Sequence, residues 1–169
     1  MPVPPTESSV PDSGEPSLQE RLAPENRCFG CGPANERGLH IRSFPDPDDP
    51  EILVARWQPS PHHEAFDGIL NGGILGTLLD CHSNWAATWH LMRRDDLDTP
   101  PCTVTADFHV RLQRPTPSGE PLHLSARAVA SEGPQVTVDA ELSSGGRVTC
   151  TCTGHFVAVR PGHPAYHRW

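Results

Sequence analysis

One segment of this chain, Gly68 to Met92 (GILNGGILGTLLDCHSNWAATWHLM), constrains the fold more than any other. Its large apolar residues recur every three or four positions, which is the period of a helix with a buried stripe; they are Ile74, Leu78, Trp85, Trp89 and Met92. The opposite stripe is small or polar rather than charged; it holds Gly73, Gly76, Thr77, Asp80, Ser83, Asn84 and Ala87. We therefore expect a helix buried on all sides, with its small-residue face against a partner or a substrate.

Segments with alternating apolar and polar residues surround this helix, and a period of two is typical of β-strands. They span residues 51–58, 103–113, 122–130, 135–143 and 147–159. Short turns rich in Gly, Pro and Ser join the later segments, so we expect antiparallel hairpins. The pattern predicts an α+β fold in which one long central helix lies against one curved antiparallel β-sheet.

The length of 169 residues fits one domain with its own core. Residues 1–24 are rich in proline, serine and acidic side chains and have almost nothing apolar to bury, so we expect a disordered N-terminal tail. We expect residues 25–160 to form the folded domain and residues 161–169 to form a C-terminal tail.

The formal charge of −8 argues against nucleic acid as a partner, because such binding depends on clustered lysine and arginine. No apolar run approaches the roughly 18 residues needed to span a membrane. The N-terminus lacks the basic and apolar regions of a signal peptide. We therefore expect a cytoplasmic protein that binds neither nucleic acid nor a membrane.

The six cysteines raise the question of disulfides or zinc. Without a secretory signal, a disulfide framework is not expected. Cys28 and Cys31 have the spacing of a zinc knuckle, but the only other close pair is Cys150 and Cys152. One intervening residue on a strand points both thiols the same way without the turn that a knuckle uses. A structural turn at Cys28–Cys31 is favoured over a metal or redox site, and we expect no metal.

The two adjacent glycines and Asp80 carry the chemistry of the helix. Glycines at a helix N-terminus expose backbone N–H groups where the helix dipole is positive, which suits an anion or oxyanion. A carboxylate further along the helix can act as a general base or a nucleophile. The competing interpretation is structural, with a loop-to-helix corner at the glycines and a hydrogen-bonded core carboxylate at Asp80.

The stretch resembles hotdog-fold acyl-CoA thioesterases of the PaaI-like, phenylacetate-pathway type. Their pattern is His-Gly-Gly followed, seven residues after the second glycine, by a catalytic acid, and here Asn71-Gly72-Gly73 and Asp80 keep that spacing. The segments CFGCGPANERGLHI (28–41) and TADFHVRLQRPTPSGEPL (105–122) are also similar to the family, so the resemblance covers about residues 27–159. It implies a hotdog fold, assembly as homodimers or dimers of dimers, and cofactor-free hydrolysis of acyl-CoA thioesters.

The resemblance also implies roles for single residues. Gly72, with Gly73 nearby, offers the N–H group that polarises the thioester carbonyl, and Asp80 activates water or attacks as the nucleophile. Thr105 falls where relatives carry a Ser or Thr that helps to hold the water. Asn71 stands in place of the usual His, and its side-chain oxygen can cap the helix.

The remaining site residues are less closely tied to the family pattern. His63 and Asn84 are the expected substrate-binding residues. Cys81-His82 replaces the common acidic residue after the aspartate, and His62, His63 and His82 are the nearest groups for further proton transfer, or else structural histidines. Two other functions stay open, a non-catalytic acyl-CoA binding or sensing module and a hydratase or dehydratase, although the latter needs a catalytic histidine where Asn71 stands.

The spacing of Gly72 and Asp80 bears on assembly. Eight residues of helix span about 12 Å, whereas an oxyanion donor and a base must each lie within roughly 3 Å of the reacting atoms. Two antiparallel copies related by a two-fold axis can place Gly72 of one subunit opposite Asp80 of its partner. We therefore expect a site shared between two subunits.

Overall fold

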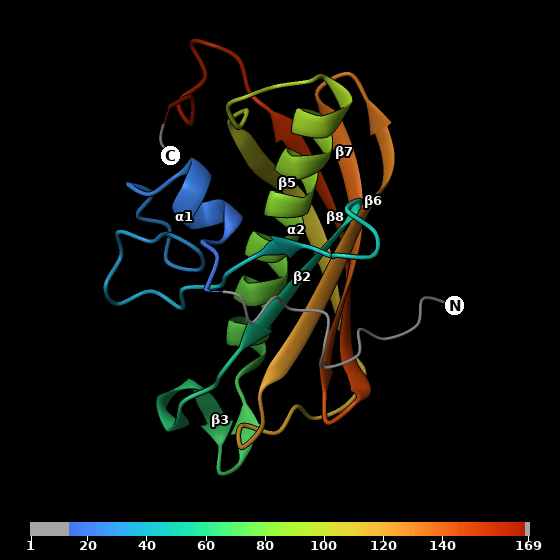
Figure 1. Cartoon of the computed structure of the whole chain (residues 1–169). Helices are drawn as coiled ribbons and strands as arrows, with labels where there is room; N and C mark the ends of the chain where they lie inside the picture. Colours follow the sequence, from blue (N-terminus) through green and yellow to red (C-terminus); the bar gives the residue numbers. More distant parts are fainter. Residues whose placement is uncertain (1–13, 168–169) are drawn as a thin grey trace.

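The computed structural model describes residues 14–167 of the chain. The long helix predicted from the sequence spans residues 72–94 and comes before the four long strands in chain order (Figure 1). The helical elements are α1 (Leu18–Leu22), η1 (Pro61–His63) and α2 (Gly72–Arg94). The strands are β1 (Phe44–Pro45), β2 (Ile52–Trp57), β3 (Glu64–Phe66), β4 (Ile69–Leu70), β5 (Thr103–Leu112), β6 (Leu122–Glu132), β7 (Gln135–Ser144) and β8 (Arg147–Ala158).

The long strands form one antiparallel sheet in the order β1-β2-β6-β7-β8-β5, and β3 pairs separately with β4. Helix α2, drawn in green, runs along one face of this sheet and contacts β2, β5, β6, β7 and β8 (Figure 1). The predicted α+β fold, with one central helix against an antiparallel sheet, is confirmed.

The core lies between α2 and the inner face of the sheet. Leu78 and Trp85 are fully buried from the helix side, and Leu124, Leu142 and Phe156 meet them from β6, β7 and β8. Burying an aliphatic or aromatic side chain of this size contributes roughly 1.5–3 kcal/mol. Trp85 is therefore part of the core and does not line an open pocket.

The small-residue face of α2 is buried unevenly along the helix. Ser83 and Ala87 in its second half are buried, whereas Gly72, Gly76 and Asp80 in its first half are partly exposed. Burial on all sides is thus confirmed only for residues 85–88, and Asn84, Trp89 and His90 are partly exposed. The first half keeps an accessible strip beside strand β5.

The expected N-terminal tail requires a correction. Ser17 and Glu20 form a capping box that starts α1, and Leu18 is only 1% exposed. The Gln19 side chain exchanges hydrogen bonds with Ser43, which in turn bonds the buried ring of His82 on α2. The apolar side chains of Leu18, Leu22 and Ala23, together with this buried polar network, pack α1 onto the domain. Residues 1–13 and 168–169 lie outside the described residues.

Strand β5 forms one edge of the sheet, and a bulge interrupts its pairing with β8 between Thr105 and Asp107. An extra residue in a strand reverses the alternation of the side chains that follow it. Thr105 before the bulge and Phe108 and Leu112 after it consequently all face α2. Beyond this edge no further strand of residues 14–167 covers them, so Phe108 is 42% and Leu112 56% exposed.

Within residues 14–167, no helix combines the length and apolarity needed to cross a membrane.

Candidate active site

The N-terminus of α2 is held by Asn71. Its side-chain oxygen accepts hydrogen bonds from the backbone N–H groups of Gly73, at 2.8 Å, and Ile74, at 3.2 Å. The N–H of Asn71 itself donates to the carbonyl of His63 at 3.0 Å, so η1 fixes where the helix begins. The helix cap expected from the asparagine is confirmed.

Because of this cap, the backbone N–H groups of Gly72 and Gly73 differ in their availability to a ligand. The N–H of Gly73 is already bonded to the Asn71 side chain, so it is not available to an oxyanion in this conformation. Gly72 is the first residue of α2, and the first N–H groups of a helix have no acceptor within the helix. Of the two donors expected from the sequence, the geometry leaves Gly72.

Asp80 lies two turns further along α2. Its Oδ1 accepts a hydrogen bond of 2.7 Å from the Thr105 hydroxyl across the gap between helix and strand β5. Burial raises the pKa of the Asp80 carboxyl, the Thr105 hydrogen bond opposes that rise, and the nearby Cys28 sulfur adds to it. A partly buried carboxylate with a raised pKa is a stronger base toward water than a fully solvated one.

Strand β5 runs antiparallel to α2, and its side chains contact the exposed face of the helix at three successive positions. Leu112 lies against Gly72, Phe108 against Gly76, and Thr105 against Asp80. The Gly72 N–H and the Asp80 carboxylate therefore open onto the same strip, at opposite ends of the first half of the helix. The helix separates them by about 12 Å.

The two expected substrate-binding residues, His63 and Asn84, lie in different parts of the structure, His63 at the end of η1 and Asn84 on α2. The ring of His63 packs near Trp57, with ring centroids 4.8 Å apart, and its Nδ1 accepts from the Ser60 N–H at 2.9 Å. Burial, together with the adjacent His62, lowers the pKa of His63. Asn84 donates to the Thr103 carbonyl at 3.4 Å, and its buried Oδ1 has no hydrogen-bond partner among the described residues.

His82 is structural. It is completely buried, its Nδ1 lies 2.8 Å from the Ser43 hydroxyl and its Nε2 lies 3.1 Å from the Leu53 carbonyl oxygen. Because the carbonyl can only accept, Nε2 carries the proton and Nδ1 accepts from Ser43. Burial lowers the pKa of His82 to about 4. Of the open interpretations of this histidine, the structural one therefore holds, and a role in proton transfer does not.

Sequence reasoning missed a cluster of sulfur atoms beside Asp80. The Sγ atoms of Cys28, Cys31 and Cys81 all lie within 4.8 Å of one another. Cys150 and Cys152, the pair weighed from the sequence, are buried in β8 instead. The available signal was that Cys28, Cys31 and Cys81 all lie in or directly beside the segments that carry the family resemblance.

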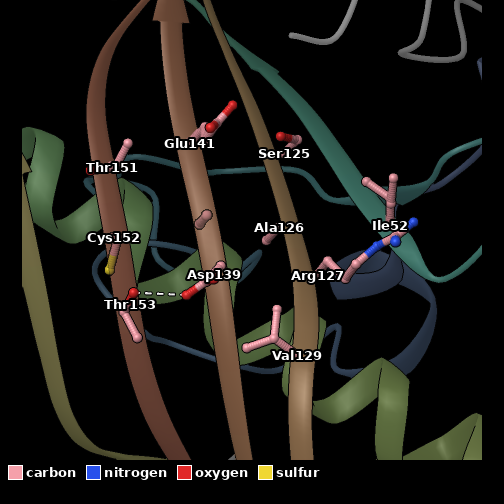
Figure 2. A pocket seen from close by; sticks show the side chains of 11 residues that line it. Ile52, Ser125, Ala126, Arg127, Val129, Asp139, Glu141, Thr151, Cys152 and Thr153 are labelled. Carbon is pink, nitrogen blue, oxygen red and sulfur yellow. Dashed lines mark hydrogen bonds between the residues drawn. The ribbon is translucent and has the colours of Figure 1, made fainter. Parts of the chain in front are cut away.

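A hollow of about 750 Å³ lies away from this site, on the face of β6, β7 and β8 that points away from α2 (Figure 2). Charged side chains such as Arg127, Asp139 and Glu141 line it. Asp80 lies on the opposite side of the sheet, so we do not assign this hollow as part of the candidate active site.

No family model matches the chain, and no curated protein matches it. Solved structures do match. A thioesterase superfamily protein from Shewanella loihica PV-4 is 26% identical with a TM-score of 0.60, covering 76% of this chain and 98% of that one. The chain has the hotdog fold of these thioesterase superfamily proteins.

Two further solved structures share the fold at lower identity. A second thioesterase superfamily protein is 22% identical with a TM-score of 0.64, over 78% of this chain, and this chain spans only 60% of its length. The E. coli PaaI protein from the phenylacetic acid degradation operon is 15% identical with a TM-score of 0.60, over 72% of this chain and 81% of that one. The hotdog arrangement implied by the family resemblance is confirmed.

Proposed function

We propose that this hotdog protein is an acyl-CoA thioesterase whose active site is shared between two antiparallel copies of α2. The observation that carries the proposal is the hydrogen bond from Thr105 to Asp80. It holds a partly buried carboxylate on the accessible strip of the helix whose N-terminus presents the Gly72 N–H. Thioesterase chemistry needs these two groups, an electrophilic donor and a base.

In the proposed reaction the Gly72 N–H polarises the thioester carbonyl. Asp80 accepts a proton as water attacks the carbonyl carbon, and Thr105 positions the carboxylate. The tetrahedral intermediate collapses by breaking the C–S bond, and the CoA sulfur leaves as a thiol with the proton that Asp80 took from water, which returns Asp80 to its carboxylate form. A single preorganised oxyanion donor contributes roughly 10²–10³ in rate, and this scheme uses no metal.

Two features favour a partner copy on the strip between α2 and β5. Gly72 and Asp80 lie too far apart on one helix to act on one carbonyl, as argued from the helix rise. The edge strand β5 also presents Phe108 and Leu112 to solvent, and a free sheet edge with apolar side chains is normally covered. A second copy, turned by a two-fold axis, would cover this edge and bring its own Gly72 toward Asp80.

The direct test measures thiol release from a panel of short, long, branched and aromatic acyl-CoAs. We expect the protein to hydrolyse at least one class of acyl-CoA. The rate per folded protein molecule should be the same with and without a chelator. Saturable acyl-CoA binding without thiol release would instead identify a non-catalytic binding module. Hydration of an enoyl-CoA without thiol release would identify a hydratase.

A further inference from the structure

The three convergent cysteines come from two separate parts of the fold. Cys28 and Cys31 lie in the turn before the loop that leads to β1, whereas Cys81 lies on α2. The Sγ atoms of Cys28 and Cys81 are 3.7 Å apart although 53 residues separate them in sequence. Neither the hydrolysis proposed above nor the packing of the core requires three thiols at one point.

The turn is shaped to bring its sulfurs onto the helix. Gly32 N–H donates to the Cys28 carbonyl at 2.8 Å and closes the turn, while Ile41 N–H donates to Gly30 at 3.0 Å and ties it to the following segment. A Cβ atom at Gly30 would overlap the Cys81 sulfur. Glycine at this position is therefore what allows the turn to reach the thiol of α2.

The sulfur spacing fits a tetrahedral metal. Two thiolates bound to Zn²⁺ at about 2.3 Å with tetrahedral angles lie roughly 3.8 Å apart, close to the 3.7 Å between Cys28 and Cys81. The whole trio needs only a small closure from its widest separation of at most 4.8 Å. A disulfide would use two of the three sulfurs and leave the third without a role.

We propose that Cys28, Cys31 and Cys81 bind one Zn²⁺ ion and thereby fasten the N-terminal turn to α2. Because Cys28 is exposed, the fourth position of the tetrahedron faces solvent and takes a water molecule. The ion stabilises the wall of the strip beside Asp80 and takes no part in hydrolysis. From the sequence we expected no metal because the only candidate partners for Cys28 and Cys31 were the strand cysteines Cys150 and Cys152. In the structure the third sulfur comes from Cys81 instead.

The test uses the full chain, reduced, stripped of metal and shown to be folded by circular dichroism. Titration with Co²⁺ under anaerobic conditions should give one ion per chain with a thiolate-to-cobalt charge-transfer band, and Zn²⁺ should displace it. The variant Cys28→Ser should weaken binding by at least about 10²-fold, since even outer-shell changes cost 10–100-fold. The matched control Cys102→Ser, another cysteine variant outside the trio, should bind as the wild type does.

Zinc should also raise the melting temperature of the wild type and of Cys102→Ser, and leave that of Cys28→Ser unchanged. Cys28 is exposed and Cys81 is buried, so we expect Cys28→Ser to fold even if Cys81→Ser does not. Cys28→Ser therefore tests metal binding in a folded protein. The proposal is overturned if the folded wild type gives no charge-transfer band, or if Cys28→Ser binds equally well. Selective retention of Cu⁺ over Zn²⁺, or a Cys28–Cys31 disulfide in freshly purified protein, overturns the zinc assignment. Absence of thioesterase activity would not affect any of these readouts.

Discussion

The hydroxyl of Thr105 donates a 2.7 Å hydrogen bond to the carboxylate of Asp80. Another Thr–Asp pair with the same donor–acceptor distance lies on the outer face of the sheet, where Thr153 donates to Asp139 at 2.7 Å. The two pairs differ in their surroundings, because Asp80 is partly buried beside α2 and Asp139 is exposed. This difference gives an internal control for the proposed base.

We expect Asp80→Asn to leave the fold intact and to lower kcat by at least about 10²-fold, the low end for loss of a general base. The control Asp139→Asn should retain wild-type turnover, as measured by thiol release. Thr105→Val should lower kcat roughly tenfold, corresponding to one hydrogen bond to a charged group. Wild-type kcat in a folded Asp80→Asn protein would assign Asp80 a structural role.

We expect Asn71→Ala to destabilise the protein by about 1 kcal/mol, because it removes the acceptor for the N–H groups of Gly73 and Ile74. Urea unfolding measures this directly. Asn71→Ser keeps a capping oxygen and should recover most of the loss. Equal stability of the alanine variant and the wild type would mean that solvent replaces the cap at no cost.

A site shared between subunits predicts complementation between two inactive variants. Co-refolding of Asp80→Ala with Gly72→Val should restore about a quarter of wild-type activity, because half the dimers are mixed and each mixed dimer has one intact site of two. Co-refolding Asp80→Ala with Asp80→Asn is the control and should restore nothing. No recovery in verified heterodimers would place both groups of a site in one chain.

The edge strand β5 predicts the location of the subunit contact. Phe108→Ser should lower the molar mass measured by light scattering toward that of the monomer and should reduce thiol release in parallel. Val129→Ser is the matched control, since Val129 is 54% exposed on β6. Dimers that persist in the Phe108 variant together with monomers in the Val129 variant would move the contact to the outer face of the sheet.

Helix α1 predicts that the folded domain begins before residue 25. Leu18→Ala should cost about 2–5 kcal/mol, the range for a large-to-small change at a buried site, whereas Arg21→Ala on the exposed side of α1 should change little. Denaturant unfolding of both variants compares them. Equal stability would mean that α1 packs too loosely to contribute.

The sequence by itself determined where the long helix and the long strands lie, because burial of one face imposes a period that can be read along the chain. It also indicated that Asn71 caps the helix and that Asp80 lies on its small-residue face. Both properties are local, since they depend on residues within a few positions of each other.

The tertiary structure decided which segment meets that face. The bulge in β5 turns Thr105 toward Asp80 and leaves Phe108 and Leu112 on the same side, and one inserted residue of this kind has no periodic signature. The meeting of Cys81 with Cys28 and Cys31, and the packing of α1 through Gln19 and His82, join residues far apart in the chain. Periodicity shows that a face is buried or small, but only the fold brings a particular partner within bonding distance.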